Sequence, residues 1–141
     1  MEIYQIKIER EKKQSQLFTA TGLFWAFSNE QFEKNKTPLE PGDKYVRLPH
    51  GGFLPKSNLD TMLTGMEEIN KWFKAEINAN KETRRAHIAY ELNNHEAFYT
   101  GCIDSTCAAL GDDYTPAEVR KVYNQEQGIN FDPRHPEINQ L

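Results

Sequence analysis

Three side chains spaced four residues apart, His87, Glu91 and His95, come nearest to a metal-binding pattern in this chain. On a helix they would lie near one face, where imidazole and carboxylate groups ligate zinc or iron. A complete site needs a further ligand, and the nearest options are Cys102, Cys107 and His50. We favour the alternative interpretation, in which His95 lies at the edge of the core and His87 and Glu91 form a solvated pair. The sequence therefore predicts no metal and no other cofactor.

The turn His50-Gly51-Gly52-Phe53 is a second candidate, because basic residues bracket it. Two glycines in a hairpin usually supply positive φ angles and nothing more. A helix N-terminus beside basic side chains, however, binds anions through its backbone N–H groups. The alternative to a plain hairpin is thus a nucleotide or anion site composed of Arg47, His50, Lys56 and Asn58.

Negative charge gathers near the C-terminus, where residues 112–141 hold six acidic and three basic side chains. An acidic patch there would attract a basic partner. The simpler interpretation is that Asp112 and Asp113 only favour the N-terminus of the helix that follows them. The predicted partner-binding patch consists of Asp112, Asp113, Glu118 and Glu126.

Neither GxSxG nor HExxH occurs in the chain, and no glycine loop matches a phosphate cradle. The cysteines Cys102 and Cys107 show no CxxC spacing, and we expect two small buried residues. The sequence thus predicts that the protein is not an enzyme and has no catalytic residues.

The segments that would position these side chains include short strands near 2–9, 23–27, 44–48 and 52–55. The first is inferred from the alternation around Ile3, Ile6 and Ile8, and the second from a run of aromatic residues. Pro49-His50-Gly51-Gly52 predicts the turn of a hairpin between the last two.

Helices are predicted from spacing and capping signals. Ser28 with Gln31, and Thr115-Pro116 with Glu118, are typical helix starts. A long helix begins at Ser57 and carries an apolar stripe from Leu59 to Ile77, a second helix covers 81 to about 99, and a short one covers 104–110. We expect an α+β fold, with a small, mostly antiparallel sheet packed against the long amphipathic helix and further short helices.

The domain prediction is a single α+β domain over 1–126 and a C-terminal tail over 127–141, loosely ordered or docked. The predicted core consists of these apolar residues: Ile6, Phe24, Phe27, Phe32, Val46, Met62, Met66, Ile69, Phe73, Ile88, Leu92 and Val122.

Composition limits the classes of function. The chain has 141 residues, a net charge of −4 and two cysteines, which argues against a general nucleic-acid binder and against a disulfide scaffold. No apolar run is long enough to span a bilayer, and the N-terminus is too charged for a signal peptide. We expect a cytoplasmic protein that contacts neither membrane nor nucleic acid directly, and that could form a homodimer.

Three stretches together carry a resemblance: 24–32 (FWAFSNEQF), 51–58 (GGFLPKSN) and 90–96 (YELNNHE). They resemble a family of small proteins carried by phages and conjugative elements, notably of gut bacteria, over roughly residues 1–125. Some small proteins of such elements are anti-CRISPR proteins that inhibit the type II effector nuclease. The resemblance carries no catalytic motif, so no functional residue is transferred by it.

The resemblance implies a non-enzymatic inhibitor, acting in a bacterial host cell, that binds a defence protein. The most plausible partner is the type II CRISPR effector nuclease, whose DNA binding or activation would be blocked. The alternative function is a small-ligand module that binds a nucleotide or other anion and sequesters a defence signal.

Overall fold

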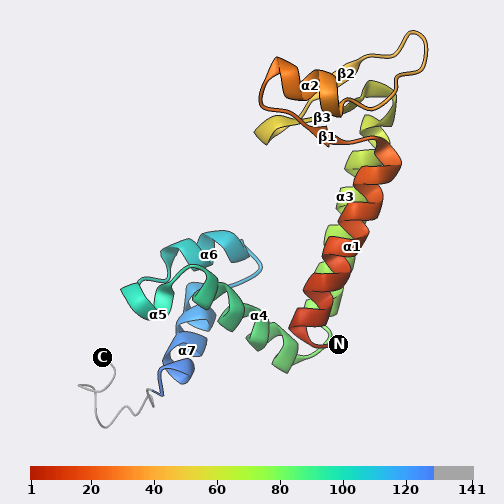
Figure 1. Cartoon of the computed structure of the whole chain (residues 1–141). Coiled ribbons are helices and arrows are strands. Elements are labelled where there is room, and N and C mark those ends of the chain that lie inside the picture. The colour runs from red at the N-terminus through yellow and green to blue at the C-terminus, as the bar shows by residue number, and fades with distance from the viewer. Residues whose placement is uncertain (129–141) are drawn as a thin grey trace. The chain divides into compact units, whose positions relative to one another are not determined.

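The computed structural model describes residues 1–128, and the contacts of the chain fall into two compact units. The N-terminal unit is Met1–Glu76 and the C-terminal unit begins at Ile77; each is described by itself. The predicted α+β class is confirmed by a small antiparallel sheet among several helices (Figure 1). The single domain over 1–126 stays a prediction, and the predicted tail lies almost wholly outside the described residues.

The elements follow one another along the chain in two groups. The first group is α1 (Ile3–Thr21), β1 (Phe24–Trp25), α2 (Asn29–Asn35), β2 (Tyr45–Arg47), the 3-10 turn Pro49–Gly51, β3 (Gly52–Pro55), the 3-10 turn Lys56–Asn58 and α3 (Leu59–Ile77). The second group is α4 (Lys81–Asn94), α5 (Ala97–Thr100), α6 (Asp104–Leu110) and α7 (Pro116–Glu126). No helix among residues 1–128 is long and apolar enough to cross a membrane.

The N-terminal segment is a helix, so the strand predicted over 2–9 is wrong. Its buried side chains, Ile3 and Ile6, are three residues apart, which is a helical and not a strand spacing. Ile8, which suggested alternation, is exposed. The charged stretch from Arg10 to Gln16, which the sequence left open between a connection and a helix, continues the same helix.

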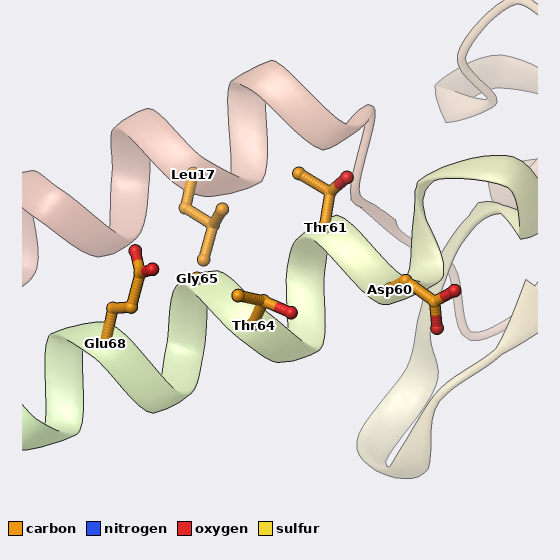
Figure 2. Close-up of a pocket in the computed structure, with 6 residues that line it drawn as sticks. All are labelled: Leu17, Asp60, Thr61, Thr64, Gly65 and Glu68. Atoms are coloured by element: carbon orange, nitrogen blue, oxygen red, sulfur yellow. The ribbon is translucent and has the colours of Figure 1, made fainter.

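The helices α1 and α3 lie side by side and antiparallel (Figures 1 and 2). The seam between them is apolar on α3, where Met62 and Ile69 are buried, but partly cationic on α1. The Arg10 guanidinium lies 4.1 Å from the centre of the Phe73 ring, and Lys13 Nζ lies 4.8 Å from that of Trp72. Cations on aromatic faces therefore replace part of the apolar contact that a helix pair normally makes.

The sheet has the order β1-β3-β2, with both pairs antiparallel, and confirms the predicted hairpin. On one face, four aromatic rings pack with their centroids 5.1–5.6 Å apart, mostly edge to face. These rings are Phe24, Phe32, Tyr45 and Phe53, and α2 brings Phe32 to them. The predicted helix start holds as well, since Ser28 Oγ accepts a hydrogen bond from the Gln31 N–H at 3.1 Å.

The C-terminal end of α1 is closed by hydrogen bonds from three parts of the chain. Gly22, at a φ of 74°, ends the helix so that the Leu23 N–H donates to the Phe18 carbonyl at 3.0 Å. The Asn58 side-chain amide donates to the Thr21 carbonyl at 2.9 Å, and the Thr37 hydroxyl donates to the Gly22 carbonyl at 2.7 Å. The carbonyls that a helix end leaves unpaired are thus satisfied inside the N-terminal unit.

The C-terminal unit is built around one apolar cluster of α4 to α7. Leu92 of α4, Ala97 of α5 and Val119 of α7 are its fully buried members. The predicted helix over 81–99 is interrupted at His95–Glu96, where Glu96 takes a left-handed conformation, and α5 begins after it. As a result Tyr99, which an unbroken helix over 81–99 would place on the same face as Leu92, is 91% exposed.

Candidate functional site

The backbone that follows β1 is fixed by hydrogen bonds on both sides. The Trp25 carbonyl accepts from the Asn35 side-chain amide at 2.9 Å, and the Ala26 N–H donates to the Gly51 carbonyl at 3.0 Å. The Phe27 N–H donates to Gln31 Oε1 at 2.8 Å. Three consecutive residues are therefore held by α2 and by the hairpin turn; Ala26 is buried, whereas the side chains of Trp25 and Phe27 are exposed.

The rings of Trp25 and Phe27 rest on two consecutive glycines of the hairpin. A Cβ at Gly51 would lie 2.5 Å from the Phe27 ring, and one at Gly52 would lie 3.2 Å from the Trp25 ring. Gly51 also has a φ of 89°, which side-chain-bearing residues rarely adopt. We call these four residues, Trp25, Phe27, Gly51 and Gly52, the aromatic platform.

The two rings of the aromatic platform are exposed even though the backbone that carries them is fixed. Phe27 is 75% exposed and Trp25 is 47% exposed. Phe27 was predicted in the core; that prediction is wrong, because the chain turns after Ala26 to begin α2 and leaves the ring outside. Aromatic side chains held in one conformation lose little entropy on binding, so the arrangement is suited to contact with an apolar surface.

The four residues of the predicted anion site are not brought to one place. Arg47 and His50 lie at the turn end of the hairpin, while Lys56 and Asn58 follow β3 at its far end, about 13 Å away for a four-residue strand. The Asn58 amide is also engaged by the Thr21 carbonyl. His50 is exposed, with a φ of 66° in the turn.

The predicted acidic patch is partly neutralised by arginines of α4. Arg84 donates to both carboxylate oxygens of Glu118, at 2.7 and 3.0 Å, and Arg85 Nη2 lies 2.7 Å from Glu126 Oε1. Of the four predicted residues, only Asp112 and Asp113 have exposed side chains outside these two ion pairs. The local negative charge is smaller than the sequence indicated.

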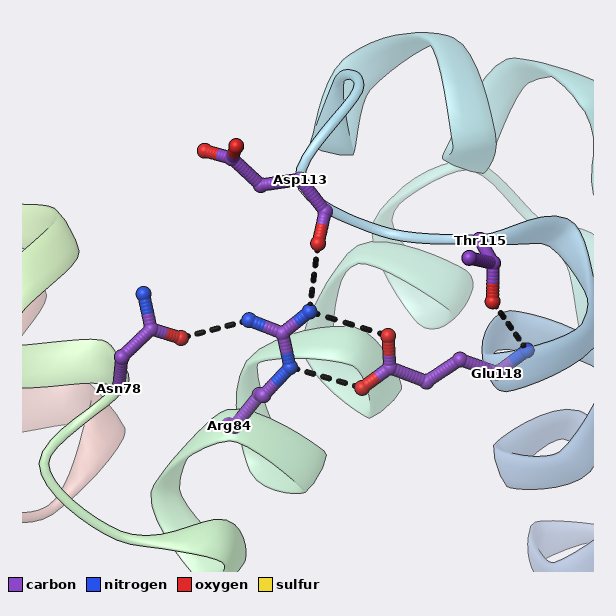
Figure 3. A network of polar contacts seen from close by, with 5 residues as sticks. All are labelled: Asn78, Arg84, Asp113, Thr115 and Glu118. Atoms are coloured by element: carbon purple, nitrogen blue, oxygen red, sulfur yellow. Dashed lines mark hydrogen bonds and ion pairs between the residues drawn. The ribbon is translucent and has the colours of Figure 1, made fainter.

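Arg84 is the centre of a network that ties the start of α4 to the start of α7 (Figure 3). Besides Glu118, it donates to Asn78 Oδ1 at 2.6 Å and to the Asp113 carbonyl at 2.7 Å. Its guanidinium lies 4.0 Å from the centre of the Tyr114 ring. The hydrogen bond from Arg84 lowers the pKa of Glu118, and burial raises the pKa of Tyr114.

The predicted start of α7 is confirmed at Thr115, whereas the Glu118 side chain makes a different contact. The Thr115 hydroxyl accepts from the Glu118 N–H at 3.1 Å, as the capping signal predicted. The Glu118 carboxylate, however, pairs with Arg84. We infer that the network orders the C-terminal unit, since the Arg84 guanidinium and the Glu118 carboxylate are both engaged within it.

The weak metal candidates have roles other than those predicted. His87 is buried, 8% exposed, and lies edge to face with Tyr114, whereas His95 ends α4 and lies 3.4 Å from a Glu91 oxygen. His87 is thus the buried histidine and His95 the one beside Glu91, which is the reverse of the prediction. Within residues 1–128, no three His, Cys, Asp or Glu side chains are grouped to hold a metal ion. Of the cysteines expected to be buried, Cys102 is exposed and Cys107 is half-buried.

The aromatic platform was not found from the sequence, although two of its signals were present. The run Phe24-Trp25-Ala26-Phe27 was interpreted as a buried strand, and Gly51-Gly52 as a turn or an anion loop. Their connection depends on the register Trp25↔Gly52, which only the folded sheet supplies. A paired glycine opposite an aromatic run is the signal that could have suggested it.

Comparison with known proteins places the chain in a family and gives no activity. Residues 6–128 match the model described as a family of unknown function (DUF7659), and the chain belongs to that family. No curated protein and no solved structure matches the chain.

Proposed function

We propose that this chain is a binding protein that acts by contact with a partner protein through the aromatic platform. One observation carries the proposal: Phe27 is 75% exposed, yet its backbone and its ring are both held in place by the fold. Aromatic residues of this kind are typical of the few interface positions that supply most of the binding energy.

A protein surface fits the aromatic platform better than a nucleic acid does. Stacking of bases on aromatic rings works together with a basic surface that neutralises phosphates. Here α2, which begins at Asn29, carries Glu30, Glu33 and Lys34, with Glu33 paired to Lys36, so it is not a basic surface; the chain as a whole carries a charge of −4. The platform therefore favours an apolar pocket on a protein.

The resemblance noted above suggests which partner to test first, a type II CRISPR effector nuclease blocked by an inhibitor of this kind. The aromatic platform supports a contact made through apolar groups. Mimicry of DNA by an acidic face has less support, because Glu118 and Glu126 are paired with arginines.

The test is affinity purification from a bacterial host with the unaltered chain and with Phe27→Ser. Tyr99→Ser is the matched control, because it removes an aromatic ring that is 91% exposed in the other unit. We expect a partner that the unaltered chain and Tyr99→Ser retain and that Phe27→Ser loses, with affinity reduced at least about 30-fold in a direct titration.

The purified nuclease, with and without guide RNA, serves as the first direct titration. A partner bound equally well by Phe27→Ser would contradict the proposed use of the aromatic platform. Failure of the nuclease to bind in either form would remove that partner and leave the contact surface to be tested with the proteins that co-purify.

A further inference from the structure

A shallow groove of about 430 Å³ runs along the seam of α1 and α3 (Figure 2). Leu17 from α1 points at Gly65 on α3, where a Cβ would lie 2.5 Å from the leucine methyl carbon. The leucine thus occupies the space that a side chain at position 65 would take. Together, Leu17 and Gly65 give the groove an apolar floor.

The rest of the groove is polar and acidic. Thr61 and Thr64 contribute hydroxyl groups, and Asp60 and Glu68 contribute carboxylates. Asp60 and Glu68 are eight residues apart on α3, or about 12 Å along the helix axis. Both are exposed, and neither is in an ion pair with any residue from 1 to 128.

Other charges near the groove do not cancel these carboxylates. On α1, Lys13 precedes Leu17 by about one turn and lies over the Trp72 ring, which is one turn beyond Glu68. On α3 itself, Lys71 pairs with Glu67, at 3.2 Å. The groove therefore presents an apolar floor with negative charge at two points along one side.

We propose that this groove binds an amphipathic helix of a partner protein that carries lysine or arginine on both sides of an aliphatic residue. A groove between two antiparallel helices is the position that a third helix occupies in a bundle. The aliphatic side chain lies over Leu17 and Gly65, and the two basic side chains, about two turns apart, reach Asp60 and Glu68. This contact is separate from the aromatic platform and does not depend on it.

The experiment uses the full chain and two designed helical peptides of about 18 residues, long enough to be helical in water. One peptide has a central leucine with lysine four residues before and after it; the other has glutamate at those positions. Binding is measured by fluorescence anisotropy at low and high salt, and the site by backbone NMR shifts. We expect the lysine peptide alone to bind, more weakly at high salt, with the largest shifts at Thr64 and Gly65.

Four substitutions sharpen the test. Asp60→Asn and Glu68→Gln should each weaken binding of the lysine peptide about two- to five-fold, as expected for an exposed ion pair. Glu67→Gln is the matched control, since that carboxylate is on α3 but outside the groove, and it should leave the affinity unchanged. Equal binding of both peptides, or shifts outside the groove, would overturn the proposal. Phe27→Ser should leave peptide binding intact, which separates this result from a failure of the aromatic platform.

Discussion

The two units of the chain differ in how they hold a few of their charged and aromatic side chains. In the C-terminal unit, Arg84 and Arg85 are engaged by Glu118 and Glu126, and Tyr123 is buried in the apolar cluster. In the N-terminal unit, Trp25 and Phe27 face solvent, as do the groove carboxylates. The comparison indicates that these C-terminal arginines and carboxylates are paired within their own unit, whereas Trp25, Phe27 and the groove carboxylates stay exposed, as the two proposed contacts require.

The largest expected effect comes from removing a core side chain of the C-terminal unit. Leu92 is fully buried, so Leu92→Ala should lower the free energy of unfolding of that unit by about 2–5 kcal/mol. Both tryptophans, Trp25 and Trp72, belong to the N-terminal unit, so tryptophan fluorescence follows that unit while circular dichroism follows all helices. Urea unfolding measured both ways tests whether the units are independent.

We expect the circular-dichroism transition of Leu92→Ala to split, with the fluorescence midpoint unchanged. The control Leu63→Ala makes the same substitution at an exposed site of α3 and should cost less than about 0.5 kcal/mol. If both signals shift together, the chain unfolds as the single domain that the sequence predicted, and the two units do not unfold independently.

The next effect concerns the glycine under the Phe27 ring. Gly51→Ala introduces a Cβ at a φ of 89° and 2.5 Å from the ring, and should cost about 1–3 kcal/mol in the fluorescence-detected transition. Gly42→Ala is the matched control, because its φ is 85° but no atom lies within 4 Å of the new Cβ. Both should lose stability, and only Gly51→Ala should also weaken partner binding. Equal partner binding by the two variants would mean that binding does not require the contact between the Phe27 ring and Gly51.

A smaller effect is expected from the ion pair of the C-terminal unit. Because Arg84 lowers the pKa of Glu118, the pair stabilises the fold above the ordinary carboxyl pKa and is lost as the pH falls through the lower, folded value. Glu118→Gln should cost about 1 kcal/mol at pH 7, measured by urea unfolding, and the cost should shrink at pH 3. Glu67→Gln, in an exposed pair, should be nearly neutral at both pH values. A cost that does not change with pH would exclude the charged pair as its cause.

The smallest effect is expected at the aromatic platform itself. Phe27→Ser removes a ring that is 75% exposed, so the free energy of unfolding should change by less than about 0.5 kcal/mol. Thermal unfolding followed by tryptophan fluorescence measures it. A large loss of stability would show that the Phe27 ring supports the fold. It would contradict the interpretation that Phe27 is exposed for contact with a partner.

The elements that could be predicted from the sequence are those whose signals are local. The apolar stripe predicts α3, the Thr115-Pro116 start predicts α7, and Ser28 with Gln31 predicts α2. In each case the deciding contacts lie within about one helical turn or repeat at one spacing. The hairpin of β2 and β3 was predicted for the same reason.

The misplaced elements depend on contacts distant in sequence. The periodicity of α1 is hidden because a cation, Arg10, occupies its buried side and stacks on Phe73 of α3. The acidic residues near the C-terminus looked available because their arginine partners lie 34 and 41 residues earlier in the chain (118 − 84 and 126 − 85). The aromatic platform likewise needs the pairing of β1 with β3. The two residues of each of these contacts lie too far apart in the sequence to form a local pattern.

The hydrogen bonds that close the end of α1 have a consequence for the order of folding. Asn58 reaches back 37 residues to Thr21, and Thr37 reaches back 15 residues to Gly22. Both bonds require that long loops close first, which is slow relative to helix formation. The end of α1 is thus expected to be completed after the transition state, so Asn58→Ala would speed unfolding and leave the folding rate almost unchanged.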